Sequence, residues 1–316
     1  MSAGPLSPYR SPEHRRRAVR DVASAAGGEV VPYGQSVEGE ALEAVRVPSS
    51  RGASRRVLCS ANIHGPEWIG CEVALALLQT AADAGSPAAA LLHHAELWVV
   101  PCLNPDGYRR TFERQGVGPL VHLRTNAHGV DLNRNYPLPG GARRHRLPGS
   151  GSTTPGDTTY VGPAPLSEPE TAALDRLCAE QGFWASTNLH SFMGTMIPAH
   201  VDDRPCFRHY ARLCRAMADA QPRHRYRRLA ARVLDTFTGE QEDHQHHVHD
   251  TWAVCIEVFP VLASYRQHWR PPSTFWRFNP HDPGPWIDND LPGVIAWLRA
   301  ALDSPRPSEL RAQASA

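Results

Sequence analysis

The chain carries at residues 56–67 the stretch RVLCSANIHGPE, in which a short apolar run leads into His64 and Glu67. A short run of mostly apolar residues is typical of a buried strand, here over residues 56–61. Apolar side chains then recur on or near one face over residues 68–84, which predicts a helix. The stretch therefore predicts a strand and a helix joined by a turn that carries two residues of metal-binding type.

Three more short segments predict further buried strands, at residues 97–102, 184–189 and 252–259. Helical patterns fall between the runs at 168–181 and 208–220, and residues 30–47 alternate and break like a pair of strands. Buried strands that alternate with helices favour an α/β architecture, because the parallel strands need helical crossovers. We expect an α/β fold with a mixed, mainly parallel sheet and helices on both faces.

Polar segments bound a single expected domain over residues 29–303. Residues 1–28 are polar and rich in proline and arginine, which predicts an N-terminal extension, and residues 304–316 predict a flexible tail. The stretch 140–165 is rich in glycine, proline, serine and threonine. We interpret it as a long surface loop within the domain, because candidate site residues on both sides of it contribute to one proposed site.

The bulk composition excludes several classes of protein. The chain has 316 residues, of which 41% are hydrophobic, and a net charge of +1, which gives no reason to expect a nucleic-acid partner. No apolar run approaches the roughly 18 residues of a membrane span, and no signal-peptide pattern opens the chain. The seven cysteines include no CxxC pair, which favours a reducing compartment and a cytoplasmic location. The oligomeric state is left open.

Two histidines and a glutamate form the principal candidate metal site. His64 and Glu67 follow the first predicted strand, and His190 directly follows the strand predicted over residues 184–189. Two imidazoles and one carboxylate are a typical ligand set of catalytic zinc, which keeps a fourth position for water. A second HxxE, from His93 to Glu96, precedes a strand instead of following one. Because ligands of open α/β sheets bind beyond the carboxyl ends of the strands, position favours the first copy.

Glu257 is a lone carboxylate within the last apolar run, CIEVF. A buried charge is costly and is retained mainly where it is paired or used. Two interpretations follow: Glu257 is a salt-bridged structural residue, or it is the general base of the site.

With these residues assembled, the chain resembles the zinc carboxypeptidases, the family that includes carboxypeptidases A and B. The resemblance covers roughly residues 30 to 300 and includes four further motifs in the family's order. They are LNPDGY at 103–108, GVDLNRN at 129–135, YVGP at 160–163 and LSEPET at 166–171.

The resemblance implies a role for each matching residue. His64, Glu67 and His190 match the ligands of one Zn²⁺ per chain. Glu257 matches the catalytic carboxylate, and Arg124 matches the arginine that polarises the scissile carbonyl. Asn133 and Arg134 match the pair that binds the terminal carboxylate of a peptide or peptide-like substrate. A metallocarboxypeptidase would use zinc to lower the pKa of a water, and Glu257 would take its proton.

The chain also departs from the family's pattern. The family's loop tyrosine would fall at Asp235, or at Phe237 after a shift, and no tyrosine occurs between Leu234 and Trp252. Phe192 stands where a tyrosine is common, and Pro66 replaces a frequent arginine. Glu242 matches a residue that lines the specificity pocket, and an acidic side chain there favours a basic terminal residue.

The segment DHQHHVHD at residues 243–250 contains four histidines that the resemblance does not explain. We interpret it as a solvated rim, with a second metal site or a contact to an acidic substrate as the alternatives. The aromatic residues of FWRF at 275–278, with Trp286, are interpreted as packing residues.

Two other functions remain open from the sequence alone. One is a zinc amidohydrolase or deacylase that acts on a small N-acyl amino acid or a biosynthetic intermediate. The other is a non-catalytic binding module, which would normally have lost a metal ligand or the base.

Overall fold

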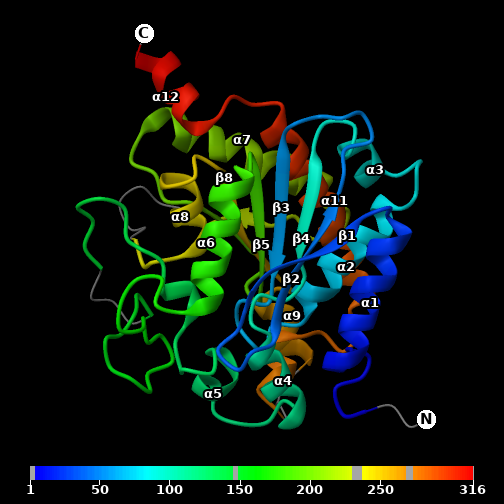
Figure 1. Ribbon diagram of the computed structural model, residues 1–316, viewed down its shortest axis with the longest axis vertical. Coiled ribbons are helices and arrows are strands. Elements are labelled where there is room, and N and C mark those ends of the chain that lie inside the picture. Colours follow the sequence, from blue (N-terminus) through cyan, green and yellow to red (C-terminus); the bar gives the residue numbers. More distant parts are fainter. Residues whose placement is uncertain (1–3, 145–148, 230–236, 268–272, 316) are drawn as a thin grey trace.

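The computed structural model describes residues 4–144, 149–229, 237–267 and 273–315, and within them the strands form one twisted mixed sheet (Figure 1). Its strand order is β1-β2-β4-β3-β5-β8-β6-β7. The strands are β1 (Glu29–Gln35), β2 (Ala41–Val47), β3 (Arg56–Ala61), β4 (Glu96–Val100), β5 (Ala185–Ser191), β6 (Thr195–Pro198), β7 (Arg227–Arg228) and β8 (Trp252–Val258).

Four neighbouring strands at the centre of the sheet, β4, β3, β5 and β8, are mutually parallel. The pairs β1–β2, β2–β4 and β6–β8 are antiparallel, and β6–β7 is parallel. The carboxyl ends of β3, β5 and β8 therefore lie side by side. This confirms the expected mixed, mainly parallel sheet, and it brings together the segments that follow the predicted strands.

Helices cover both faces of the sheet because successive residues of the central strands point to opposite sides. Val57 and Cys59 pack into one core with residues of α1 (Pro12–Ala25), α2 (Ile69–Ala81), α7 (Arg204–Ala220) and α11 (Gly284–Leu302). Leu58, between them, packs into a second core with Leu174, Leu177 and Cys178 of α6 (Pro169–Gln181). In Figure 1, α6 lies in front of the central strands, and α2 and α11 lie behind them.

Shorter helices connect these layers and shape the edge of the sheet where the predicted ligands lie. They are α3 (Pro87–Leu91), α4 (Pro105–Glu113), α5 (Leu120–Arg124), the 3-10 turn η1 (Leu132–Arg134), α8 (Gln241–His247), α9 (Val261–Gln267), α10 (Phe275–Phe278) and α12 (Pro307–Ser315). None of the described helices is both long and apolar enough to cross a membrane. The aromatic residues Phe275, Trp276 and Phe278 of α10 are buried, as the packing interpretation expects.

Helices lie near both ends of the described chain. Within the expected N-terminal extension, residues 1–28, Val19, Val22 and Ala23 of α1 belong to the main core. The expected flexible tail contains α12, which is held in part because Asp250 accepts hydrogen bonds from the backbone N–H and hydroxyl of Ser308. In both segments the apolar residues are sparse, so composition alone does not reveal the packing.

Candidate metal centre

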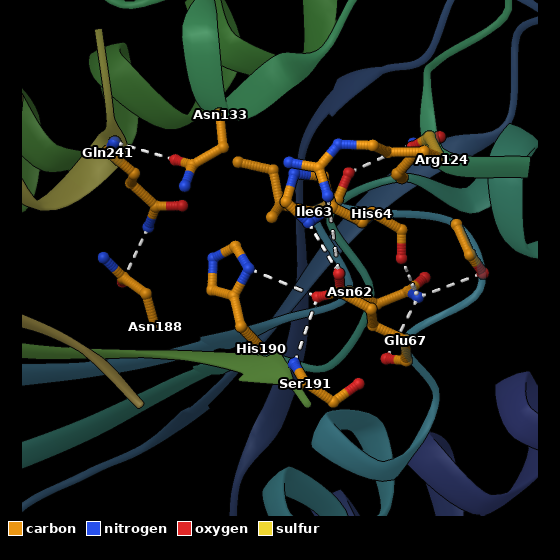
Figure 2. Close-up of polar contacts among 12 residues, drawn as sticks. Asn62, Ile63, His64, Glu67, Arg124, Asn133, Asn188, His190, Ser191 and Gln241 are labelled. Carbon is orange, nitrogen blue, oxygen red and sulfur yellow. Dashed lines mark hydrogen bonds and ion pairs between the residues drawn. The ribbon is translucent and has the colours of Figure 1, made fainter. Parts of the chain in front are cut away.

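His64, Glu67 and His190 converge at the carboxyl ends of β3 and β5 (Figure 2). Nδ1 of His64 lies 2.8 Å from Oε1 of Glu67, and Nδ1 of His190 lies 3.2 Å from Oε2 of Glu67. All three side chains are buried, and their ligand atoms lie within 4.8 Å of one another. The two imidazoles and the carboxylate form the three-residue set that zinc binds with an open fourth position.

The turn that carries His64 and Glu67 is shaped by Asn62. Asn62 has a positive φ of 58°, a conformation that asparagine tolerates better than most residues. Its buried Nδ2 donates to the carbonyl oxygen of His64 at 2.9 Å and approaches those of Gly65 and Glu67 at 3.4 Å. The side chain thus replaces the backbone partners that the turn would otherwise lack.

Gly65 allows the turn to pack directly against two other segments. A Cβ at this position would collide with the carbonyl oxygen of Leu123 and would lie 2.7 Å from the backbone of Gly107. The Gly65 N–H donates to the carbonyl oxygen of Arg124 at 3.1 Å. Only glycine fits here, and the contact holds Arg124 beside the turn that carries His64 and Glu67.

Asn279, more than two hundred positions further along the chain, fixes the other end of the turn. Its Oδ1 accepts hydrogen bonds from the N–H groups of Trp68 and Ile69 at 2.8 and 2.9 Å, where α2 begins. Its Nδ2 donates to the carbonyl oxygen of Pro66 at 2.7 Å. Because nothing local marks this residue, sequence reasoning missed it.

Asp131, in the GVDLNRN motif, lies directly behind His64. Its Oδ1 lies 3.1 Å from Nε2 of His64, and its Oδ2 accepts a hydrogen bond from Nε of Arg124 at 3.0 Å. Burial would raise the pKa of the Asp131 carboxyl, but the Arg124 and His64 charges hold that pKa below its ordinary value. The carboxylate therefore favours the tautomer with the proton on Nε2, which leaves Nδ1 of His64 for a metal.

Replacement of Asp131 by asparagine is expected to weaken zinc binding about 10–100-fold, the usual effect of losing a partner of a metal-binding histidine. An asparagine amide keeps the shape but presents a dipole in place of the charge that orients the imidazole. Zinc titration against a competing chelator measures the change. An unaltered zinc affinity would contradict this role for Asp131.

Glu257 lies on β8, directly opposite His190 on β5 in the parallel register. Burial, with the neighbouring Glu67 carboxylate, raises the pKa of the Glu257 carboxyl to about 8. A cation held by His64, Glu67 and His190 would lower this pKa, because a nearby opposite charge favours the carboxylate. Its Oε2 is buried and has no hydrogen-bond partner among the described residues. In the described part of the chain, this oxygen therefore has no partner that would explain Glu257 as a purely structural residue.

All eight predicted site residues line one pocket of about 280 Å³. They are His64, Glu67, Arg124, Asn133, Arg134, His190, Glu242 and Glu257. Other lining residues that sequence reasoning did not assign to the site include Ile197, Glu240, Cys255 and Phe278. Phe192, where the family often has a tyrosine, lines the pocket as well and stacks edge-on against Phe278.

The amide of Asn133 and the guanidinium of Arg134 are both held by the segment around α8. Oδ1 of Asn133 accepts a hydrogen bond from the N–H of Gln241 at 3.0 Å (Figure 2). Because the oxygen is engaged, the Asn133 NH₂ group is the part of the amide left to donate. Nη1 of Arg134 forms an ion pair with Glu240 at 3.1 Å, and its Nε donates to the carbonyl oxygen of Gly149.

The structure corrects the interpretation of the histidine-rich segment as a solvated rim. Residues 241–247 form α8, and His244 and His246 are buried within the protein. Asp235, the position at which the family's tyrosine would fall, lies outside the described residues. The second HxxE is remote from the site, since Glu96 pairs with Arg46 and Arg56 instead.

The sequence profile of the zinc carboxypeptidases matches residues 25–262 of this chain, about three quarters of its length. The chain belongs to the zinc carboxypeptidase family. The family uses Zn²⁺, and the buried His64, Glu67 and His190 fit that ion by donor type and by mutual spacing.

Individual relatives match over part of their length. A metallocarboxypeptidase A-like protein from Trichophyton verrucosum is 32% identical over 172 residues, which cover 52% of this chain and 39% of the relative. Human carboxypeptidase A6 is 33% identical over 152 residues, which cover 45% of this chain and 32% of the relative. The alignments thus span only about a third of the length of these relatives.

Solved structures share the fold over almost the whole chain. Bovine thrombin-activatable fibrinolysis inhibitor, in complex with a tick carboxypeptidase inhibitor, superimposes with a TM-score of 0.74. It is 18% identical, with 93% of this chain and 98% of that chain covered. Carboxypeptidase A from Helicoverpa armigera gives a TM-score of 0.71 at 19% identity, with coverage of 93% and 74%. These similarities confirm the expected zinc-carboxypeptidase-like fold.

Proposed function

We propose that this protein is a zinc metallocarboxypeptidase that hydrolyses the last peptide bond of a substrate with a free C-terminal carboxylate. The observation that carries the proposal is the shared pocket, in which a metal triad, a carboxylate, an arginine and a carboxylate-binding pair line one cavity. Zinc, when bound, would lower the pKa of a water molecule toward neutrality and polarise the scissile carbonyl.

Glu257 acts as the general base in this proposal. Its carboxylate takes a proton from the attacking water and gives it to the leaving amine. Arg124 donates hydrogen bonds to the oxyanion that develops on the scissile carbonyl. Its position supports this role, because the guanidinium forms ion pairs with Asp131 and with the buried Glu67, and these contacts restrict its movement.

Asn133 and Arg134 bind the terminal carboxylate. The planar guanidinium of Arg134 suits a carboxylate, and the NH₂ group of Asn133 adds a second donor. Glu240 neutralises Arg134 when no substrate is bound. A substrate carboxylate therefore replaces Glu240 as the partner of Arg134, which releases Glu240 toward the pocket.

A preference for a basic terminal residue is the finer part of the proposal. Glu242 lies in the wall of the pocket and is only 1% exposed. Burial raises the pKa of its carboxyl well above the ordinary value, and the charges of Glu240 and Asp243 add to the shift. A cationic side chain in the pocket would stabilise the ionised carboxylate and gain a charge-assisted hydrogen bond.

The preference predicts faster release of C-terminal arginine than of phenylalanine from matched peptides. Replacement of Glu242 by glutamine is expected to lower the arginine-to-phenylalanine ratio of kcat/KM about 10–100-fold, since hydrogen bonds to charged groups contribute about 1.5–3 kcal/mol. The ratio cancels general effects of the substitution on folding. A preference of the unaltered protein for phenylalanine would rule out the assignment of Glu242.

The broader proposal is tested with peptides of two to six residues beside N-acetyl amino acids. We expect release of the last residue from peptides with a free carboxylate and none from the same peptides with an amidated end. Faster hydrolysis of the N-acetyl amino acids would identify the chain as a deacylase instead.

We also propose that the protein works in the cytoplasm. All seven cysteines are buried free thiols, a state that a reducing compartment maintains. Fractionation of cells with an antibody to the native chain tests the location, and recovery from the medium or an extracytoplasmic compartment would contradict it.

A further inference from the structure

A second group of metal-binding side chains lies outside the pocket, where α6 meets the end of α8. Asp175 belongs to α6, His244 belongs to α8, and His249 is the second residue after α8. Nε2 of His244 lies 2.7 Å from Oδ1 of Asp175, and Nε2 of His249 lies 2.8 Å from the same oxygen. None of the three residues lines the pocket that holds His64, Glu67 and His190.

The donor atoms are of the type and spacing that a transition-metal ion requires. Their mutual separations are within 4.8 Å. A tetrahedral zinc ion with ligands at about 2.0–2.2 Å needs its donor atoms about 3.3 Å apart, so small side-chain rotations would admit an ion. Two neutral imidazoles and one carboxylate carry a charge of −1, so the group with a bound divalent cation has a net charge of only +1.

A metal ion can take the place of the two hydrogen-bond protons between the histidines and Asp175. Each imidazole donates from Nε2 to Asp175, whose Oδ1 has a lone pair for each. Nδ1 of His244 is buried without a hydrogen-bond partner among the described residues, so no other contact forces the proton onto Nε2. The neutral ring can therefore present Nε2 to a metal.

The three side chains are buried enough to be ordered, and Asp175 is exposed enough for an ion to reach them from solvent. The exposed fraction of the side chain is 4% for His244, 9% for His249 and 26% for Asp175. An ion could enter from the Asp175 side, and a water molecule could complete its coordination there.

We propose that Asp175, His244 and His249 bind a second Zn²⁺ ion that joins α6 to α8. Its structural consequence concerns the pocket, because α8 also carries Glu242 and supplies the N–H of Gln241 that holds Asn133. The second ion would anchor α8 by its far end and so steady these residues. The binding itself does not depend on the proposed peptidase activity.

Zinc stoichiometry in four proteins tests the inference. After dialysis of the zinc-loaded proteins against metal-free buffer, we expect two Zn²⁺ per chain in the unaltered protein. Asp175→Asn and His190→Ala are each expected to retain one, and the double variant none. Asp175→Asn suits the test because an amide oxygen still accepts both hydrogen bonds, so the packing of α6 against α8 is kept while the metal-binding charge is lost.

His247→Ala serves as the matched control. His247 is an exposed histidine of the same helix, and its loss is expected to leave two ions bound. His249→Ala, which removes a ligand instead of the carboxylate, is expected to leave one.

A stoichiometry of one in the unaltered protein, or two in Asp175→Asn, would overturn the second site. Loss of one ion from His247→Ala would also overturn it, because the histidine-rich segment would then bind zinc without a defined site. If Asp175→Asn bound one ion while His190→Ala still bound two, the second site would stand and the proposed catalytic centre would fail.

Discussion

Replacement of Glu257 by glutamine is expected to lower kcat for release of a C-terminal residue by about 10²–10⁴-fold, the usual contribution of a general acid–base residue. Glutamine keeps the shape of the side chain and its place on β8, but its amide does not accept a proton at neutral pH. The zinc content should not change, because Glu257 is not one of the three proposed ligands. Single-turnover kinetics with a saturating peptide, beside metal analysis, measure both quantities.

Glu113→Gln provides the control for this experiment, since Glu113 is an exposed carboxylate at the end of α4. It should leave kcat unchanged. If Glu257→Gln retained full turnover, the carboxylate would not be the base, and the water would have to lose its proton to another group of the pocket.

The second large effect is expected from His190→Ala. Loss of one of three ligands should weaken zinc binding at the pocket by more than the 10–100-fold typical of losing a hydrogen-bond partner of a ligand, and it should abolish detectable turnover. It also leaves the Glu67 carboxylate buried without the imidazole that now lies 3.2 Å away. The variant should therefore lose the part of the zinc-dependent rise in Tm that this site contributes, which corresponds to about 2.7 kcal/mol at a free zinc concentration of one hundred times the Kd of the site.

Thermal unfolding with and without zinc measures this effect, and His94→Ala is the control because His94 is exposed and remote from the pocket. A His190→Ala protein that bound zinc at the pocket as tightly as the unaltered chain would show that His190 is not a ligand.

The sequence predicts the centre of the fold well, and the reason is physical. Strands β3 and β8 are short, almost wholly buried runs of mostly apolar residues, which marks them directly. Strand β5 is equally buried and lies between them in the sheet, although most of its residues are polar. Because such strands are parallel and adjacent, residues at their carboxyl ends meet in space. For this reason the sequence alone groups His64, Glu67 and His190.

The supports of the site could not be predicted in the same way. Asn279 and Asp131 act through long-range hydrogen bonds to N–H groups and an imidazole, and no local pattern encodes such partners. Asn62 donates within its own turn, and its positive φ is set by the fold around that turn. Helix α11 was missed for a related reason: polar residues and Pro292 interrupt its apolar pattern, and its buried face is stabilised by packing against other elements.

For the histidine-rich segment at residues 243–250, the local sequence predicts exposure, whereas the structure shows a partly buried helix. A run with four histidines and two aspartates reads as solvent-exposed when charge and polarity are considered alone. In the fold, Asp175 of α6 accepts from two of these histidines, and Tyr210 of α7 contacts a third, His246. Partners from distant segments therefore allow the helix to be buried, and they are invisible in the local sequence.

X-ray diffraction from zinc-loaded crystals on either side of the zinc absorption edge tests the central claim most directly. We predict an anomalous difference peak within about 2.0–2.2 Å of Nδ1 of His64, a Glu67 carboxylate oxygen and Nδ1 of His190. Well-ordered crystals with bound zinc elsewhere, but with no anomalous peak among these three side chains, would contradict it.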